Sequence, residues 1–138
     1  MTYVLDASAL LRFLDKEAGG DRVRDLLQGA VKKRLRLLLS AANWGELVHA
    51  LYKRNPGNAE TILNDLQRLP VSVVPVDAAD AAVAGKLKWK YHIPYADALA
   101  AALCMSSSQS DRTILVTADY DFKSLQKGLI AIEFLPAK

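Results

Sequence analysis

Cysteine and long hydrophobic runs are nearly absent from this chain of 138 residues. Cys104 is the only cysteine, so no intramolecular disulfide can form, and its apolar surroundings predict a small buried side chain rather than a reactive thiol. The longest uncharged apolar run, Ala98 to Met105, is far shorter than the ~20 residues that a membrane-spanning helix needs. The first residues, MTYVLD, lack the basic segment of a secretion signal. These absences predict a soluble, cytoplasmic protein that is held together by its own core.

Sequence motifs for nucleotide cofactors are missing as well, because the chain has neither Gly-x-Gly-x-x-Gly nor a Walker A loop. Histidine is scarce, and His49 and His92 are the only two. Glu46 and His49 form a Glu-x-x-His pair, but a di-iron site in a helical bundle needs two such pairs and further glutamates. We therefore expect His49 to be an ordinary helix residue.

Short apolar runs alternate with amphipathic segments, and Gly and Pro residues separate many of them. The pattern predicts strands at residues 3–5, 35–39, 71–76, 113–117 and 130–134, and helices at 7–14, 21–31, 41–54, 59–69, 77–91, 95–105 and 122–126. Strands that alternate with helices predict right-handed βαβ crossovers and a mainly parallel sheet that is covered on both faces. We expect a single α/β domain over residues 1–138, with three layers.

Four acidic residues stand next to apolar runs that are expected in the core. Asp6 directly follows the first predicted strand, and Asp119 follows the fourth. If these two strands are neighbours, both acids lie at the carboxyl edge of the sheet, where the winding reverses and α/β proteins bind ligands. Glu46 and Asp97 lie in predicted helices that can present them to the same place. The positions of the four acids, taken together, indicate a functional site at this edge of the sheet.

Each acid also has an ordinary structural interpretation. Asp6 can cap a helix, Glu46 can occupy a solvated helix position, and Asp97 can be a stabilising acid in a first helical turn. Asp119 and Asp121 follow a strand, where aspartate is a common turn residue. Only the position of Asp6, directly after a predicted buried strand, indicates a functional site without support from the other acids.

The negative charges of a carboxylate cluster must be neutralised, either by protons or by bound cations. Two carboxylates about 4 Å apart repel each other by roughly 4 kcal/mol at an effective dielectric constant near 20. Either some pKa values rise or cations enter. Mg²⁺ and Mn²⁺ prefer oxygen ligands, and at such a site they can activate a water for attack on a phosphodiester.

Basic residues exceed acidic ones, with 18 against 15 and a net charge of +3. If four acids converge in one site, the remaining surface carries 18 basic against 11 acidic residues, an excess that suits a polyanion. Arg12 and Lys16 lie one helical turn apart beyond Asp6, and we expect them to contact phosphate. The basic clusters at residues 32–36 and 86–90 are expected to be mostly solvated surface charges.

The local sequences around the four acids resemble those of the PIN domain. The motifs are DASALL near the start, GEL within a helix, ADAL at the start of an Ala-rich helix, and LVTADYDF after an apolar run. The resemblance spans Tyr3 to Phe134 and is strongest to the VapC toxins of bacterial and archaeal toxin–antitoxin pairs. It implies a metal-dependent endoribonuclease with a central parallel sheet, usually a homodimer, that a small VapB-like antitoxin holds inactive.

Carried over by position, the resemblance implies site residues. The Mg²⁺ or Mn²⁺ ligands are Asp6, Glu46, Asp97 and Asp119, while Ser8 and Thr117 match polar residues that border the site. Asp121 is a fifth acid or a loop anchor and ranks below the other four. Two features depart from the family: Ala118 replaces a common glycine, and the polar loop at 106–112 is longer than usual and is expected to be solvated.

Two alternative functions remain open at this stage. A phospho-acceptor domain of receiver type is also α/β with acids at strand ends, but it is expected to have an acidic pair after the first strand, where Asp6 stands alone. A catalytically silent PIN-like RNA-binding module would use the same acids only to hold a structural ion.

Overall fold

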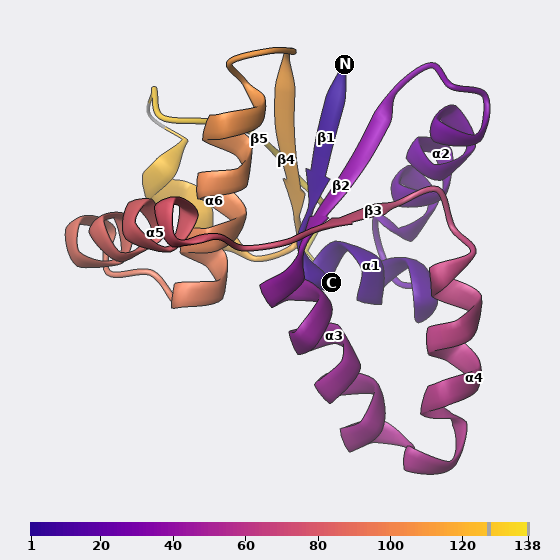
Figure 1. Cartoon of the computed structure of the whole chain (residues 1–138). Helices are drawn as coiled ribbons and strands as arrows, with labels where there is room; N and C mark the ends of the chain where they lie inside the picture. The colour runs from indigo at the N-terminus through magenta and orange to yellow at the C-terminus, as the bar shows by residue number, and fades with distance from the viewer. Residues whose placement is uncertain (127, 138) are drawn as a thin grey trace.

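The computed structural model describes residues 1–126 and 128–137 and contains one sheet of five parallel strands in the order β3-β2-β1-β4-β5 (Figure 1). β1 lies at the centre, where Leu5 pairs with Leu39 of β2 on one side and with Val116 of β4 on the other. The strands are β1 (Thr2–Leu5), β2 (Arg36–Ser40), β3 (Ser72–Val74), β4 (Thr113–Thr117) and β5 (Ala131–Phe134).

Helices cover both faces of this sheet, which confirms the predicted three-layer α/β architecture (Figure 1). Tyr3 and Leu5 of β1 pack into a core cluster that is supplied by α1 to α4, whereas Val4 between them packs into a cluster with α5, α6 and η1. The helices are α1 (Ala7–Leu14), α2 (Gly20–Val31), α3 (Ala41–Arg54), α4 (Pro56–Gln67), α5 (Ala78–Tyr91), α6 (Tyr95–Ser107) and the 3₁₀ helix η1 (Tyr120–Leu125).

The winding of the sheet reverses between β1 and β4. The chain runs outward from β1 through β2 to β3, and then returns to the other side of β1 as β4 and β5. The carboxyl ends of β1 and β4 therefore lie side by side at the switch point, where a ligand site is expected. Asp6 and Asp119 follow these two strands, as the sequence predicts.

Most predicted elements are observed, and the differences lie at their ends. α4 begins at Pro56 rather than residue 59, because the Asn55 side chain accepts a hydrogen bond from the Gly57 backbone amide and Pro56 suits a first helical turn. β3 is shorter than predicted and ends before Pro75. α6 continues to Ser107, two residues into the segment that was expected to be a loop.

Among the described residues, none of the helices combines the length and the apolar character that crossing a membrane requires.

Cys104 is fully buried in α6, as its apolar surroundings predict. Burial raises the pKa of its thiol to about 12, because an apolar environment disfavours the charged thiolate. The thiolate is the reactive form, so Cys104 is an inert core residue at neutral pH.

Arg12 has a structural role that the sequence did not indicate. Its side chain is 8 % exposed, and its Nη1 donates hydrogen bonds of 2.6 Å to the Ala18 carbonyl and 2.7 Å to the Pro136 carbonyl. The guanidinium thus ties α1 to the loop before α2 and to the segment after β5, so the expected phosphate contact is at odds with its burial. Lys16 is exposed and follows the end of α1, and its contact with phosphate stays a prediction.

Replacing Arg12 by Met should lower the free energy of unfolding by about 2–3 kcal/mol, because two hydrogen bonds from a charged donor to backbone carbonyls are lost. Arg54→Met is the matched control: Arg54 forms an exposed ion pair with Asp15 at 2.8 Å, which should contribute at most about 1 kcal/mol. Urea denaturation of both variants checks this. Equal stability of Arg12→Met and the parent protein would show that the two hydrogen bonds do not hold the fold together.

Candidate metal centre

Asp6 is the buried cap of α1 at the end of β1. It is 3 % exposed, and its Oδ1 accepts hydrogen bonds from the Ala9 backbone amide at 3.1 Å and the Ser8 hydroxyl at 2.6 Å. Its Oδ2 accepts a 2.7 Å hydrogen bond from the Thr117 hydroxyl. Burial raises the pKa of Asp6, while these hydrogen bonds oppose the rise. The capping role and the site role of Asp6 therefore coexist in one side chain.

Ser8 and Thr117 join the two strand ends through Asp6. Each hydroxyl donates its single proton to the Asp6 carboxylate and accepts a backbone amide, Ala118 N–H at 2.9 Å for Ser8 and Asp119 N–H at 2.9 Å for Thr117. The turn after β4 is therefore held against the start of α1. Both residues border the acidic cluster, as their positions in the sequence led us to expect.

Asp97 lies in the first turn of α6 and is nearly buried. Its side chain is 8 % exposed, and its Oδ2 is buried without a hydrogen-bond partner in the described part of the chain. Burial is the main cause that raises its pKa to about 7, and the nearby carboxylates of Asp119, Asp6, Glu46 and Asp121 contribute to the same rise in that order. An orphaned buried carboxylate oxygen among like charges is the strongest sign of a missing positive partner.

Asp119 and Asp121 complete the group on the turn between β4 and η1. One carboxylate oxygen from each of Asp97, Asp119 and Asp121 lies within 4.8 Å of the other two. The Asp119 Oδ1 also accepts a 2.9 Å hydrogen bond from the Asp121 backbone amide, which fixes the turn. Asp121, which the sequence ranked below the other acids, thus lies within the same 4.8 Å limit of Asp97 as Asp119 does, although its charge acts on Asp97 less strongly.

Glu46 reaches the cluster from α3 and is held by a residue that the sequence reasoning missed. Its Oε1 accepts a 2.9 Å hydrogen bond from the Nδ2 of Asn43, and Asn43 is fully buried with its Oδ1 lacking a partner among the described residues. Asn43 precedes Glu46 by three residues, so both lie on one helix face. An asparagine within a helix, next to a suspected ligand, was the available signal, because Asn is a poor helix former.

The donor set fits a hard divalent cation. Asp97, Asp119 and Asp121 each bring a carboxylate oxygen within 4.8 Å of the others, and Asp6 and Glu46 lie near enough for their charges to raise the pKa of Asp97. Mg²⁺ and Mn²⁺ favour oxygen ligands of this kind. The structure brings together all four acids that the sequence singled out, together with Asp121.

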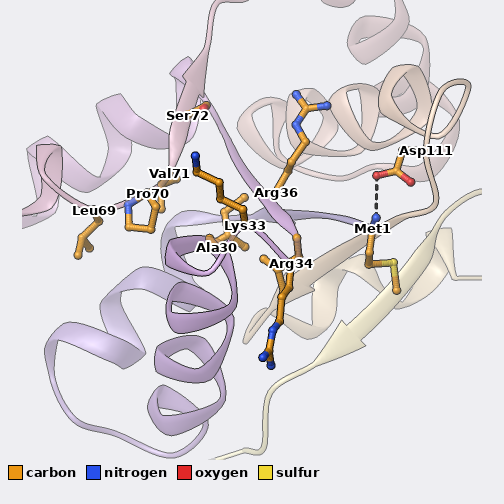
Figure 2. Close-up of a pocket in the computed structure, with 12 residues that line it drawn as sticks. Met1, Ala30, Lys33, Arg34, Arg36, Leu69, Pro70, Val71, Ser72 and Asp111 are labelled. Carbon is orange, nitrogen blue, oxygen red and sulfur yellow. Dashed lines mark ion pairs between the residues drawn. The ribbon is translucent and has the colours of Figure 1, made fainter.

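A hollow of about 560 Å³ lies at the opposite edge of the sheet (Figure 2). Lys33, Arg34 and Arg36 line it, and the Met1 ammonium forms a 2.9 Å ion pair with Asp111 there. Figure 2 shows that Arg34 points away from Lys33 and Arg36, so the cationic groups do not converge on one ligand. The predicted loop at 106–112 begins at the end of α6 and reaches this edge, far from the acids.

The fold and the site together define a class of protein: a parallel α/β domain with a carboxylate cluster at the switch point of its sheet. The sequence pattern of the PIN domain family matches residues 3–128, and the chain belongs to this family. A search of curated protein sequences finds no match.

Solved structures share the fold at low sequence identity. A chain of VapBC2 from Rickettsia felis, bound to a DNA fragment from the promoter, matches with a TM-score of 0.74, 16 % identity and coverage of 99 % of this chain and 100 % of that one. A chain of DNA-bound VapBC from Salmonella typhimurium matches with a TM-score of 0.72, 17 % identity and coverage of 97 % and 98 %. FitAcB from Neisseria gonorrhoeae matches with a TM-score of 0.64, 21 % identity and coverage of 94 % and 95 %.

The stability of the metal-free protein should fall as the pH rises from about 5 to about 8. The folded pKa of Asp97, about 7, lies above its unfolded value, so the folded state binds this proton more tightly and loses that advantage as the pH passes the folded pKa. Asp97→Asn should flatten the dependence and raise the melting temperature at pH 8 by about 2–4 °C.

Thermal melts in chelator at several pH values measure this effect, with Asp65→Asn as an exposed control on α4. A melting temperature of the parent protein that rises between pH 5 and pH 8, or an Asp97→Asn variant that is less stable at pH 8, would contradict the assigned repulsion.

Proposed function

We propose that this PIN domain is a Mg²⁺- or Mn²⁺-dependent endoribonuclease that acts as the toxin of a toxin–antitoxin pair. The observation that carries the proposal is the convergence of acidic side chains around Asp97, whose buried Oδ2 lacks a partner in the described part of the chain. Membership of the PIN family and the excess of basic over acidic residues on the rest of the surface support an anionic substrate.

In this proposal Asp6, Glu46, Asp97 and Asp119 hold the ion directly or through waters, and Asp121 is a further candidate ligand. A bound divalent ion supplies two things: a lower pKa for water and stabilisation of the charge that develops on the phosphate. With a water as the nucleophile that such an ion would activate, no side chain of the protein would be needed as a nucleophile.

The surrounding residues keep the ligands in place. Ser8 and Thr117 hold both oxygens of the Asp6 carboxylate, and Asn43 holds the Glu46 carboxylate. Partners of this kind orient ligands before an ion arrives, which preserves affinity and geometry. In the proposed reaction these three residues are positioning residues rather than ligands.

The proposed partners are RNA as substrate, a small VapB-like antitoxin and a second copy of the chain. The fold is shared with chains of VapBC and FitAcB structures, which supports the antitoxin by analogy. Co-expression with the small protein that is encoded beside this chain tests the antitoxin: we expect co-purification and loss of nuclease activity. Light scattering of the purified chain tests the homodimer.

The two alternative functions make different predictions. The receiver-like alternative loses its basis with the assignment to the PIN family. A catalytically silent PIN-like module would bind a divalent ion and RNA without cleaving any RNA. Turnover is therefore the property that separates it from the proposed ribonuclease.

Purified protein should cleave RNA in Mg²⁺ or Mn²⁺ and stop when a chelator is added. Asp6→Asn and Asp97→Asn should each lower the cleavage rate by more than about 100-fold, since the loss of a ligand exceeds the effect of losing a residue that only positions one. Asp65→Asn is the control that retains the parent rate. Gel assays on RNA and on DNA of the same sequence measure this, and full activity of either site variant would refute the assignment.

Asn43→Ala should weaken Mn²⁺ binding by about 10- to 100-fold, because Glu46 loses the donor that orients it. Asn58→Ala, an exposed asparagine on α4, is the matched control. Calorimetric titration of both variants gives the affinities. If Asn43→Ala binds Mn²⁺ as tightly as the control, Asn43 does not position a ligand.

A further inference from the structure

Trp89 stands almost entirely in solvent on the last turn of α5. It is 81 % exposed, which is the highest value among the large hydrophobic side chains of the described residues. Trp44, the other tryptophan, is partly buried against the core. An exposed indole is a large apolar surface that the fold itself does not use, so it marks a place where another molecule can pack.

The surface around Trp89 is basic. Between Asp80 and Asp97 the chain has no acidic residue, whereas Lys86, Lys88 and Lys90 are all exposed. The local roles of the lysines differ. Lys88 Nζ donates a 3.3 Å hydrogen bond to the Ile93 carbonyl, and Lys90 Nζ lies 5.4 Å from the centre of the Tyr91 ring.

Lys86 is different, because it has no hydrogen bond or ion pair within residues 1–126 and 128–137. It lies one helical turn before Trp89 on the same helix face, so its ammonium is available beside the indole.

This surface lies close to the acidic cluster along the chain. α5 ends at Tyr91, α6 begins at Tyr95, and Asp97 stands in the first turn of α6. Four residues of chain span at most roughly 14 Å, which bounds the distance from the end of α5 to the start of α6. Figure 1 shows this connection on the side of the domain toward which the strands point, the side that carries the acids.

We propose that Trp89 stacks on an unpaired base of the RNA substrate while Lys86 and Lys90 contact the flanking phosphates. The inference rests on the proposed ribonuclease function and narrows its substrate to RNA with a single-stranded segment beside the cleavage site. Every base has a π-face, so one indole accepts any sequence, and neighbouring lysines supply the attraction for the backbone.

Charge favours RNA over a second copy of the chain as the occupant. In a two-fold symmetric dimer the same patch meets itself, so the lysines around one Trp89 would face those around the other. Like charges that meet without compensating acids cost free energy, whereas a phosphate backbone compensates all of them.

The test uses a protein with Trp89 as its only tryptophan. Trp44→Phe removes the other indole, and Asp97→Asn prevents cleavage, so binding is measured apart from catalysis. A short unstructured RNA oligonucleotide is added in Mg²⁺, and the same sequence as a duplex is tested in parallel. We expect the single strand to quench the Trp89 fluorescence and the duplex to bind more weakly.

Variants in the Asp97→Asn background, followed with a labelled oligonucleotide, separate stacking from charge. Trp89→Ala should weaken binding of the single strand by about 5- to 100-fold, while Trp89→Phe keeps most of the affinity. Lys86→Ala should lower the slope of log affinity against log salt by about 0.7, the amount for one phosphate contact on a single strand. Lys32→Ala and Val31→Ala, exposed positions at the end of α2, are the matched controls and should match their parent.

Three outcomes would overturn the inference: no binding of the oligonucleotide, equal affinity of Trp89→Ala and its parent, or a Trp89→Ala variant that changes only the molar mass in light scattering. The last result would assign the patch to a second copy. Cleavage of RNA by the wild-type chain is measured separately, so a failure of this inference is distinguishable from a failure of the ribonuclease proposal.

Discussion

Mutual repulsion among carboxylates at one edge of the sheet is the constraint on which the local structure of the site depends. Much of it is relieved by donors from the chain itself: the Ser8 and Thr117 hydroxyls on Asp6, and the Asn43 amide on Glu46. Asp97 is the exception, since its buried Oδ2 has no donor in the described part of the protein. Neutral donors therefore hold two of the acids, whereas the buried oxygen of Asp97 is left without a compensating partner among the described residues.

The topology of the sheet explains why these acids meet. β1 pairs with β2 and β4 in parallel, so the segments after β1 and β4 leave the same edge as neighbours. α6, which carries Asp97, precedes β4 and packs against β1 and β4, so its first turn lies at that edge. The hydrogen bonds from the Thr117 hydroxyl to Asp6 and from the Ala118 amide to Ser8 then join the two strand ends, which are 111 and 110 residues apart in sequence at these contacts. Fold and site are thus stabilised by the same contacts.

The strand ends that carry Asp6 and Asp119 could be predicted from the sequence, whereas contacts between residues far apart in the chain could not. The apolar runs before Asp6 and Asp119 predict buried strands, so the positions of these two acids at strand ends follow from the local pattern. The structural role of Arg12 was not predictable because its partners are the carbonyls of Ala18 and Pro136, and backbone acceptors leave no trace in a sequence. In the sequence Asn43 and Asp121 resemble ordinary helix and turn residues, and only the fold shows that they lie beside the acids of the cluster.

Anomalous diffraction from crystals grown with Mn²⁺ tests the central claim most directly, because it locates the ion without reference to activity. We expect a peak among the carboxylates of Asp6, Glu46, Asp97 and Asp119, with Asp97 Oδ2 among its ligands. A cluster without bound Mn²⁺ at concentrations that support cleavage, or an ion bound only elsewhere on the chain, would contradict it.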